Sequence, residues 1–158
     1  MNFDFVYSAP PIGLLAPAAD AAGRTGTYKS LRGVRSGINL VCRVNQGNAA
    51  QVTFTPLQAK DSSGTGSKAI PAVPIFYNAD STASDTLVAQ ALYSSFQTDV
   101  TLKDKFVVFR FEPGELDLAN GFNHIAIQTS ASNSANITEA FMIAVGRYQQ
   151  AVLMPSEV

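Results

Sequence analysis

The sequence predicts an all-β fold, a single β-sandwich or jelly-roll domain with an extended N-terminal arm. Several short segments alternate between apolar and polar residues, as strands with one buried face do. Turn-forming residues separate these segments repeatedly, which is typical of sandwiches and small barrels. The length of 158 residues fits one domain that buries its own core.

Residues 1–37 lack this alternation and are expected to form the arm. Pro10, Pro11 and Pro17 disfavour helix, and the segment is also rich in glycine and alanine. A short helix over 16–22 is a weak alternative. We expect contact with a partner, rather than a core of its own, to order the arm.

A run of cations without an anion extends from the arm into the next segment: Arg24, Lys29, Arg32, Arg35 and Arg43. Residues 1–43 carry five basic and two acidic groups, whereas residues 44–158 carry six basic and ten acidic groups. The run is either a solvated stretch or part of an arm that docks on an acidic surface. We take Arg24, Lys29, Arg32 and Arg35 as candidate partner-contact residues. The net charge of −1 gives no electrostatic case for nucleic acid.

The sandwich domain, residues 38–158, is expected to open with a hairpin. Alternate apolar residues define a first strand from Ile38 to Val44 and a second around Val52 and Phe54. The residues NQGNAA between them supply the turn. Cys42 lies among apolar neighbours, so we expect a buried structural thiol rather than a nucleophile.

The rest of the domain alternates between loops and strands. Residues 60–74 are expected to form a loop, in which GTGSK lacks the glycine spacing of a phosphate-binding loop. Residues 86–98 have helical and extended features, and we expect mainly strand. Further strands are expected at 74–77, 106–111, 124–129 and 140–148. The total is seven or eight short strands.

The segment 106–129 raises the question of catalysis, because it holds the only histidine, His124, together with Glu112, Glu115 and Asp117. One histidine and one cysteine give no zinc site, and no nucleophile elbow is present. A glycosidase using Glu112 and Glu115 stays open as an alternative. We expect instead a strand, a polar turn that keeps the carboxylates in water, and a second strand. His124 should then be a surface or interface residue.

Composition limits the cellular setting. The N-terminal MNFDFVYSAPP has no basic start and no apolar core, so we expect no signal peptide. No apolar run approaches the about 20 residues of a membrane span. A single cysteine fits a reducing compartment. Charged residues make up only 15%, which leaves little repulsion between packed copies. We therefore expect a soluble protein made in a cytoplasm, with no cofactor, metal or membrane partner.

Two long segments, VVFRFEPGELDLANGFNHIAIQTSASNSANITEAFMIAV and GRYQQAVLMPSE, resemble head decoration (cement) proteins, the small proteins found beside the major capsid protein of tailed bacteriophages. The hairpin VNQGNAAQVTFTPLQAKD and the segment NADSTASDTLVAQ are also similar to that group. The resemblance covers residues 38–155. It implies a non-enzymatic β-sandwich or jelly roll that binds the outer surface of the phage head as a dimer or trimer. Such proteins bridge neighbouring capsid subunits, and they have no catalytic residues to carry over.

The expected partners are thus the major capsid protein and the protein itself, in a virion assembled in the host bacterial cytoplasm. One alternative is a carbohydrate- or receptor-binding jelly-roll module, and another is a structural subunit of the tail or baseplate. Sugar sites favour exposed aromatic platforms. The chain has no tryptophan, so the candidate platforms are Tyr7, Tyr28, Tyr77, Tyr93 and Tyr148.

Overall fold

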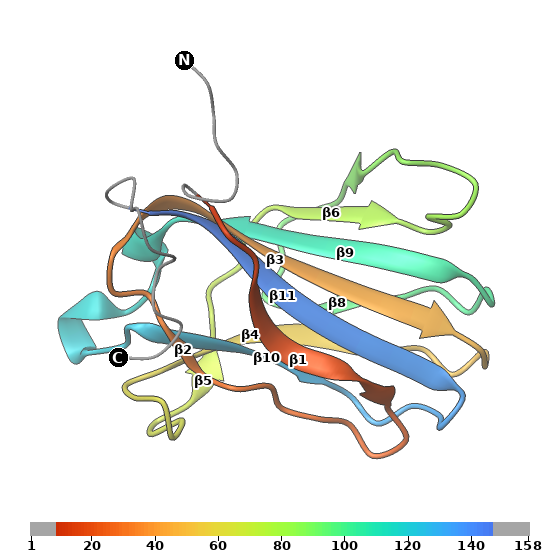
Figure 1. Cartoon of the computed structure of the whole chain (residues 1–158), viewed down its shortest axis with the longest axis horizontal. Helices are drawn as coiled ribbons and strands as arrows, with labels where there is room; N and C mark the ends of the chain where they lie inside the picture. Colours follow the sequence, from red (N-terminus) through yellow and green to blue (C-terminus); the bar gives the residue numbers. More distant parts are fainter. Residues whose placement is uncertain (1–8, 147–158) are drawn as a thin grey trace.

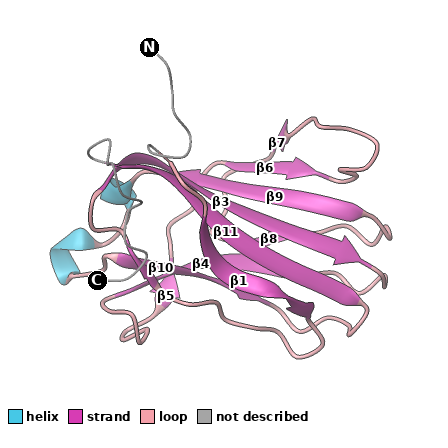
Figure 2. Cartoon of the chain, viewed as in Figure 1, coloured by secondary structure: helices cyan, strands magenta, loops and turns pink. Residues whose placement is uncertain are grey.

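The computed structural model describes residues 9–146, which form two antiparallel sheets packed together (Figure 1). The described residues contain no α-helix, and their helical parts are two short 3-10 turns, η1 (Pro113–Glu115) and η2 (Leu118–Asn120) (Figure 2). One hydrophobic cluster contains side chains from both sheets. The all-β sandwich predicted from the sequence is confirmed.

Sheet A contains the longest strands. Its order is β1 (Ile12–Ala19), β11 (Asn136–Gly146), β3 (Val34–Gln46), β9 (Asp104–Phe111), β6 (Ile75–Asn78) and β7 (Val88–Ala89). All neighbours are antiparallel. The register of β3 and β9 is unbroken from the Ile38–Phe111 pair to the Asn45–Asp104 pair. Successive side chains on these strands therefore point alternately into the sandwich and away from it.

Sheet B is smaller and covers the inner face of sheet A. Its order is β2 (Lys29–Ser30), β10 (His124–Thr129), β4 (Thr53–Ala59) and β5 (Lys68–Ala69), and β8 (Phe96–Gln97) also pairs with β4. Most of its hydrogen bonding lies between β10 and β4, which pair from His124–Ala59 to Thr129–Phe54.

The core follows the alternation read from the sequence. The inward residues on the predicted strands are all buried: Ile38, Leu40, Cys42, Val44, Val52, Phe54, Val107, Phe109, Phe111, Ile125 and Ile127. Burying an aliphatic or aromatic side chain of this size contributes roughly 1.5–3 kcal/mol. The thiol of Cys42 is among them, as expected, and burial raises its pKa. A protonated thiol inside the core is not a nucleophile.

The connection between β6 and β9 differs from the prediction. Residues 86–98 were expected to be mainly strand, but the structure pairs only β7 and β8 within them. The remainder is held by single backbone contacts, for example Gln90 N–H to the Ile75 carbonyl and Val73 N–H to the Tyr93 carbonyl. This connection crosses from an edge of sheet A to sheet B, so one regular strand cannot span it.

The N-terminal segment also differs from the predicted arm. Residues 1–8 lie outside the described residues, but residues 9–37 belong to the sandwich. Ile12, Leu14 and Leu15 are buried in its core, and β1 pairs with β11 along the edge of sheet A. The pairing contains register shifts on either side of Leu15. Pro17 lies in this edge strand, where a missing backbone donor is tolerated.

Gly26 in this segment permits close packing of the backbone. Gly26 donates its N–H to the Ile127 carbonyl of β10, at 2.8 Å. A Cβ added at Gly26 would lie 2.4 Å from the carbonyl oxygen of Leu14. A side chain cannot fit at that distance, so the backbone needs glycine there. The segment therefore bridges β1 and β10, which lie in different sheets.

Candidate interaction surface

The segment 106–129 forms the predicted strand, polar turn and strand. Glu112 Oε2 accepts a hydrogen bond from the Gly37 N–H at 2.8 Å, and Glu115 Oε2 accepts one from the Glu112 N–H at 2.7 Å. Asp117 pairs with Lys68 Nζ at 2.6 Å. The hydrogen bond from Lys68 holds the pKa of Asp117 below its ordinary value. These carboxylates shape the turn and anchor it to neighbouring segments.

His124 was expected to be a surface or interface residue, and within this chain it does not lie at the surface. Its side chain is buried, with 8% of the residue exposed. It starts β10, between Ser30 of β2 and Ala59 of β4. The segment 30–34, assigned to the arm in the prediction, lines the same hollow as His124. The imidazole Nδ1 lies 2.6 Å from Asn123 Oδ1, within hydrogen-bond distance.

The candidate contact cations do not form one surface. The Arg24 guanidinium donates to the Ala16 and Ala18 carbonyls of β1 and to both oxygens of Thr138 in β11. Its Nε lies 3.9 Å from the buried carboxylate of Asp20. Arg24 therefore fastens β1 to β11 within the chain. The sequence offered no sign of this, because the partners of Arg24 in β11 are more than 100 residues away.

The other three cations lie near the opposite end of β10. Lys29 is half-buried in β2, and Arg32 and Arg35 are exposed on the turn into β3 and at its start. Lys29 pairs with Ile125, whereas the backbone N–H of Arg24 donates to Thr129 Oγ1. Only Arg32 and Arg35 thus combine exposure with proximity in the sequence.

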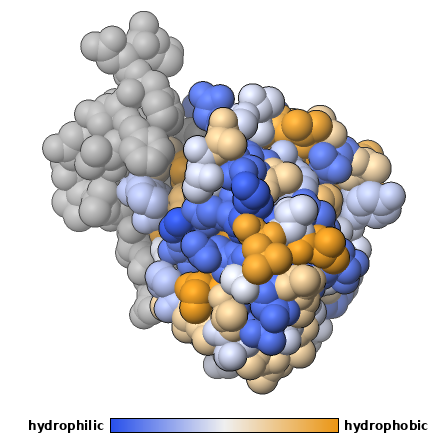
Figure 3. All heavy atoms as spheres, turned by 90° about the vertical axis from the view of Figure 1, so that its right-hand side faces the viewer, coloured by the Kyte–Doolittle hydropathy of each residue, from blue (hydrophilic) through white to orange (hydrophobic). Residues whose placement is uncertain are grey.

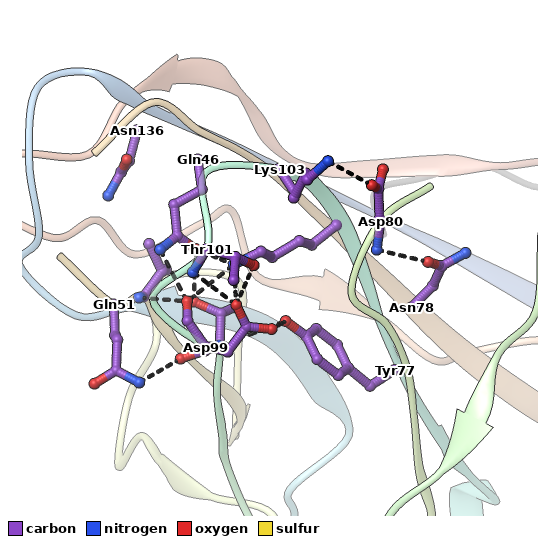
Figure 4. A network of polar contacts seen from close by, with 12 residues as sticks. Gln46, Gln51, Tyr77, Asn78, Asp80, Asp99, Thr101, Lys103 and Asn136 are labelled. Atoms are coloured by element: carbon purple, nitrogen blue, oxygen red, sulfur yellow. Dashed lines mark hydrogen bonds and ion pairs between the residues drawn. The ribbon is translucent and has the colours of Figure 1, made fainter. Parts of the chain in front are cut away.

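A polar network at one end of the sandwich surrounds a fully buried lysine. Lys105 is 0% exposed, and its Nζ donates to Gln46 Oε1 and to the carbonyl and Oδ1 of Asp99, at 2.8–3.0 Å. The Tyr77 hydroxyl points at Asp99 and donates to Oδ2 at 2.7 Å (Figure 4). Thr98 Oγ1 also donates to Gln46 Oε1. A buried charge is tolerated only when it is paired and hydrogen-bonded in this way.

This network connects the loop between β8 and β9 to neighbouring segments through hydrogen bonds. Gln46 Nε2 donates to the Asp99 carbonyl, and Gln51 Nε2 donates to the Thr98 carbonyl. Asp99 Oδ1 also accepts hydrogen bonds from the backbone and hydroxyl of Thr101. The loop from Thr98 to Lys103 is therefore tied at several points to the strands below it.

Acidification should weaken this network, because it depends on an ionised carboxylate. Partial burial alone would raise the pKa of Asp99, but hydrogen bonds from Lys105, Thr101 and Tyr77 outweigh it and hold the pKa well below its ordinary value. A carboxylate whose pKa is lower in the folded state than in the unfolded state stabilises the fold at pH values above the unfolded-state pKa of about 3.9. This stabilisation is lost as the pH falls from there toward the folded-state pKa. We expect Asp99→Asn to lose less stability than the wild type between about pH 5 and pH 2 in urea titrations.

The matched control for this experiment is Asp85→Asn, which alters an exposed carboxylate in the connection after β6. Its stability curve should fall with pH in parallel with that of the wild type. A parallel curve for Asp99→Asn would show that Asp99 does not contribute to acid sensitivity.

Exposed apolar side chains are concentrated on the 87–102 segment, the part of the chain from Leu87 to Leu102. It carries six of the eight large exposed hydrophobic residues found in residues 9–146: Leu87, Val88, Leu92, Tyr93, Val100 and Leu102. Val100 and Leu102 are 56% and 59% exposed, on the loop that the buried network holds. Figure 3 views the sandwich end-on and shows hydrophobic residues among hydrophilic ones on that face. Contiguous exposed apolar surface is typical of interaction sites, so the 87–102 segment is a candidate for one.

No group of three or more histidine, cysteine, aspartate or glutamate side chains in residues 9–146 could hold a metal ion. The same residues include no helix long and apolar enough to cross a membrane. The described surface does present the exposed apolar side chains of the 87–102 segment.

Comparison with known proteins gives little further guidance. No protein-family model matches the chain, and no curated protein matches its sequence. Among solved structures, the chain is similar to the SPBc2 prophage-derived protein YomS over 85% of this chain and 90% of that chain. The TM-score is 0.46 and the sequence identity is 10%. At these values the likeness assigns neither a family nor a function.

Proposed function

We propose that this protein is a non-enzymatic structural protein of a tailed-bacteriophage virion. In this proposal it binds the outer surface of the head and cements neighbouring capsid subunits. The observation that carries the proposal is the 87–102 segment, which presents most of the large exposed apolar side chains of residues 9–146 on a rigid sandwich. The resemblance of residues 38–155 to head decoration proteins supports the same role.

A cement protein needs a rigid body and an adhesive surface that is ordered before binding. The hydrogen bonds to Asp99 and Thr98 keep the loop of Val100 and Leu102 ordered without a partner. Binding then costs little conformational entropy, because the loop is preorganised. Repetition of modest contacts over a capsid lattice raises the overall affinity through multivalency.

The structure also bears on the hypothesis that cations of the N-terminal segment contact a partner. Arg24 donates hydrogen bonds to β1 and β11, and Lys29 is half-buried in β2. Arg32 and Arg35 are exposed and remain candidates for a second, electrostatic contact. Exposed charges of this kind influence association rate and salt dependence more than affinity.

Co-sedimentation with phage heads lacking the protein tests the proposal. We expect saturable binding of the wild type at a fixed ratio to capsid subunits. Val100→Asp plus Leu102→Asp should weaken binding at least about tenfold, because charged groups cannot be buried cheaply at an apolar contact. Arg32→Glu plus Arg35→Glu should have a smaller effect that fades as salt is raised.

The matched control is Leu118→Asp, which places the same charge at an exposed leucine of η2, outside the 87–102 segment. It should bind as the wild type does. Equal binding by the Val100/Leu102 double variant and the wild type would remove the loop of Val100 and Leu102 from the contact. A wild type that does not bind heads at all would contradict the capsid role itself.

A second candidate is a carbohydrate- or receptor-binding module, which the exposure of Tyr93 favours. Tyr93 is the one exposed tyrosine of residues 9–146, at 56%, whereas Tyr77 is packed against Phe96 and bonded to Asp99. Flat aromatic faces are the usual platforms for sugars. A glycan-array signal that disappears in Tyr93→Ala would favour this function, and so would failure to bind heads.

A further inference from the structure

The outer face of sheet A carries an apolar stripe that crosses four strands. Phe76 of β6 pairs with Val108 of β9, Val108 pairs with Val41 of β3, and Val41 pairs with Phe141 of β11. All four are only partly buried, and their inward neighbours, such as Val107 and Met142, fill the core. The stripe is therefore a second apolar surface on the side of the sheet that faces away from sheet B.

A groove runs over this stripe. Its floor includes Val41, Val108 and Phe141, with Phe106 and Ile143 beside them. The connection after β6 forms one wall, through Ser81, Ser84, Asp85 and Leu87. An antiparallel sheet with one solvated face normally places polar residues on that face. Four neighbouring strands depart from this rule here, which indicates that another surface covers the face.

The two flanks of the stripe differ in charge. On one side, Arg43 bonds to both Asp104 and Glu139, at 2.7 and 3.0 Å, so this group retains one net negative charge. On the other side lies Arg110, which is exposed, pairs across the strands with Asn39 and forms no ion pair within residues 9–146. One flank is thus acidic overall and the other is basic.

We propose that a second copy of this chain covers the stripe, in a two-fold dimer whose axis runs along it. Rotation about such an axis places the stripe of one copy on the stripe of the other. It also places each flank of one copy opposite the other flank of its partner. The Arg110 flank of one copy then faces the acidic flank of the other, twice in one dimer. An axis along the strands would instead bring like-charged flanks together. A two-fold interface must be self-complementary, and the stripe with its opposed flanks has this property.

The chain's weak net charge of −1 permits such close approach of two copies. Stacked sheets lie about 10 Å apart and fill the space with interdigitated side chains. The inference does not rest on capsid binding, because it is argued from the stripe and its flanks; Leu87 is the one residue of the 87–102 segment that also lines the groove. The test of the inference uses the purified full chain without capsids, so the two proposals can fail separately.

The first measurement is the mass of the full chain by light scattering and sedimentation over a range of concentrations. The wild type should be a dimer that dissociates on dilution. Val108→Asp should be monomeric at every concentration that keeps the wild type dimeric. Gln128→Asp, an exposed position on β10 of sheet B, is the matched control and should dimerise normally. A circular dichroism spectrum checks that each variant is folded.

The second measurement tests the flank exchange by mixing two variants. Arg110→Glu makes both flanks acidic, and Glu139→Lys makes both basic, so each variant alone should dimerise at least about tenfold more weakly. In an equimolar mixture, both flank contacts of a heterodimer are again between opposite charges. The mixture should therefore recover the wild-type affinity.

Recovery in the mixture would support both the second copy and the direction of the axis. A monomeric wild type would overturn the proposal, because some other partner must then cover the stripe. Equal weakness of the mixture and the single variants would also overturn it, since the flanks would not face one another.

Discussion

Replacing Asp20 with alanine is expected to lower the free energy of unfolding by about 3–5 kcal/mol, because it leaves buried polar groups without their partner. Asp20 is fully buried. Its two carboxylate oxygens accept hydrogen bonds from Thr129 Oγ1 at 2.9 Å and from Thr138 Oγ1 at 3.1 Å. Arg24 donates to Thr138 from the other side, at 2.7 Å. One carboxylate thus connects the N-terminal segment to both β10 and β11.

Urea unfolding of Asp20→Ala, Asp20→Asn and Asp85→Ala measures this effect. Asp20→Asn keeps one acceptor but loses the charge near Arg24, so its loss should be smaller than that of Asp20→Ala. Asp85 is exposed, and its replacement should change stability by no more than about 0.5 kcal/mol. Near-wild-type stability of Asp20→Ala would mean that the N-terminal segment is not fastened through Asp20.

Replacing Lys105 with alanine should produce a loss of similar size, about 3–5 kcal/mol, for two reasons that can be separated. The change removes a long side chain that is fully buried, and it removes three hydrogen bonds to Gln46 and Asp99. Asp99 keeps 40% of its side chain exposed, so water can solvate its carboxylate in the variant. The cavity should therefore account for more of the loss than the missing charge.

Lys105→Met separates the two contributions, because methionine nearly fills the lysine volume without a charge or a donor. Replacing buried ionic groups with apolar groups of similar volume is often close to neutral. We expect Lys105→Met to lose only about 1–2 kcal/mol in the same urea experiment. Equal losses in the methionine and alanine variants would show that the hydrogen bonds, rather than the packing, stabilise this end of the sandwich.

Both predictions involve residues whose roles could not be read from the sequence. Lys105 directly precedes the predicted strand 106–111, and a single lysine there gives no sign that it is buried. Its burial depends on Asp99 and Gln46 lying beside it in the folded chain, and Gln46 is 59 residues earlier in the sequence. Asp20 meets its partners across more than 100 residues. Such contacts follow from the pairing of distant strands.

The N-terminal segment illustrates how local signals can mislead. Prolines and glycines predicted a loose arm, and the residues IGLL within it are the signal that could have shown a strand, since Ile12, Leu14 and Leu15 enter the core. Gly26 is present because another backbone passes close by, not because the chain needs freedom. The burial of His124 depends on the same segment, which lies beside it.

The sequence by itself determined the class of fold and the inward faces of the main strands. These properties depend on an alternation with a period of two residues, which every strand expresses locally. Only the tertiary structure decided which polar residues are buried, which cations are engaged, and where apolar groups remain at the surface. These properties depend on strand order and register, and on contacts between segments far apart in the chain, so no local pattern encodes them. The apolar stripe illustrates both contributions. The residues FVVF predict a strand with two apolar faces, but only the order of strands in the sheet aligns Val108 with Val41 and Phe141.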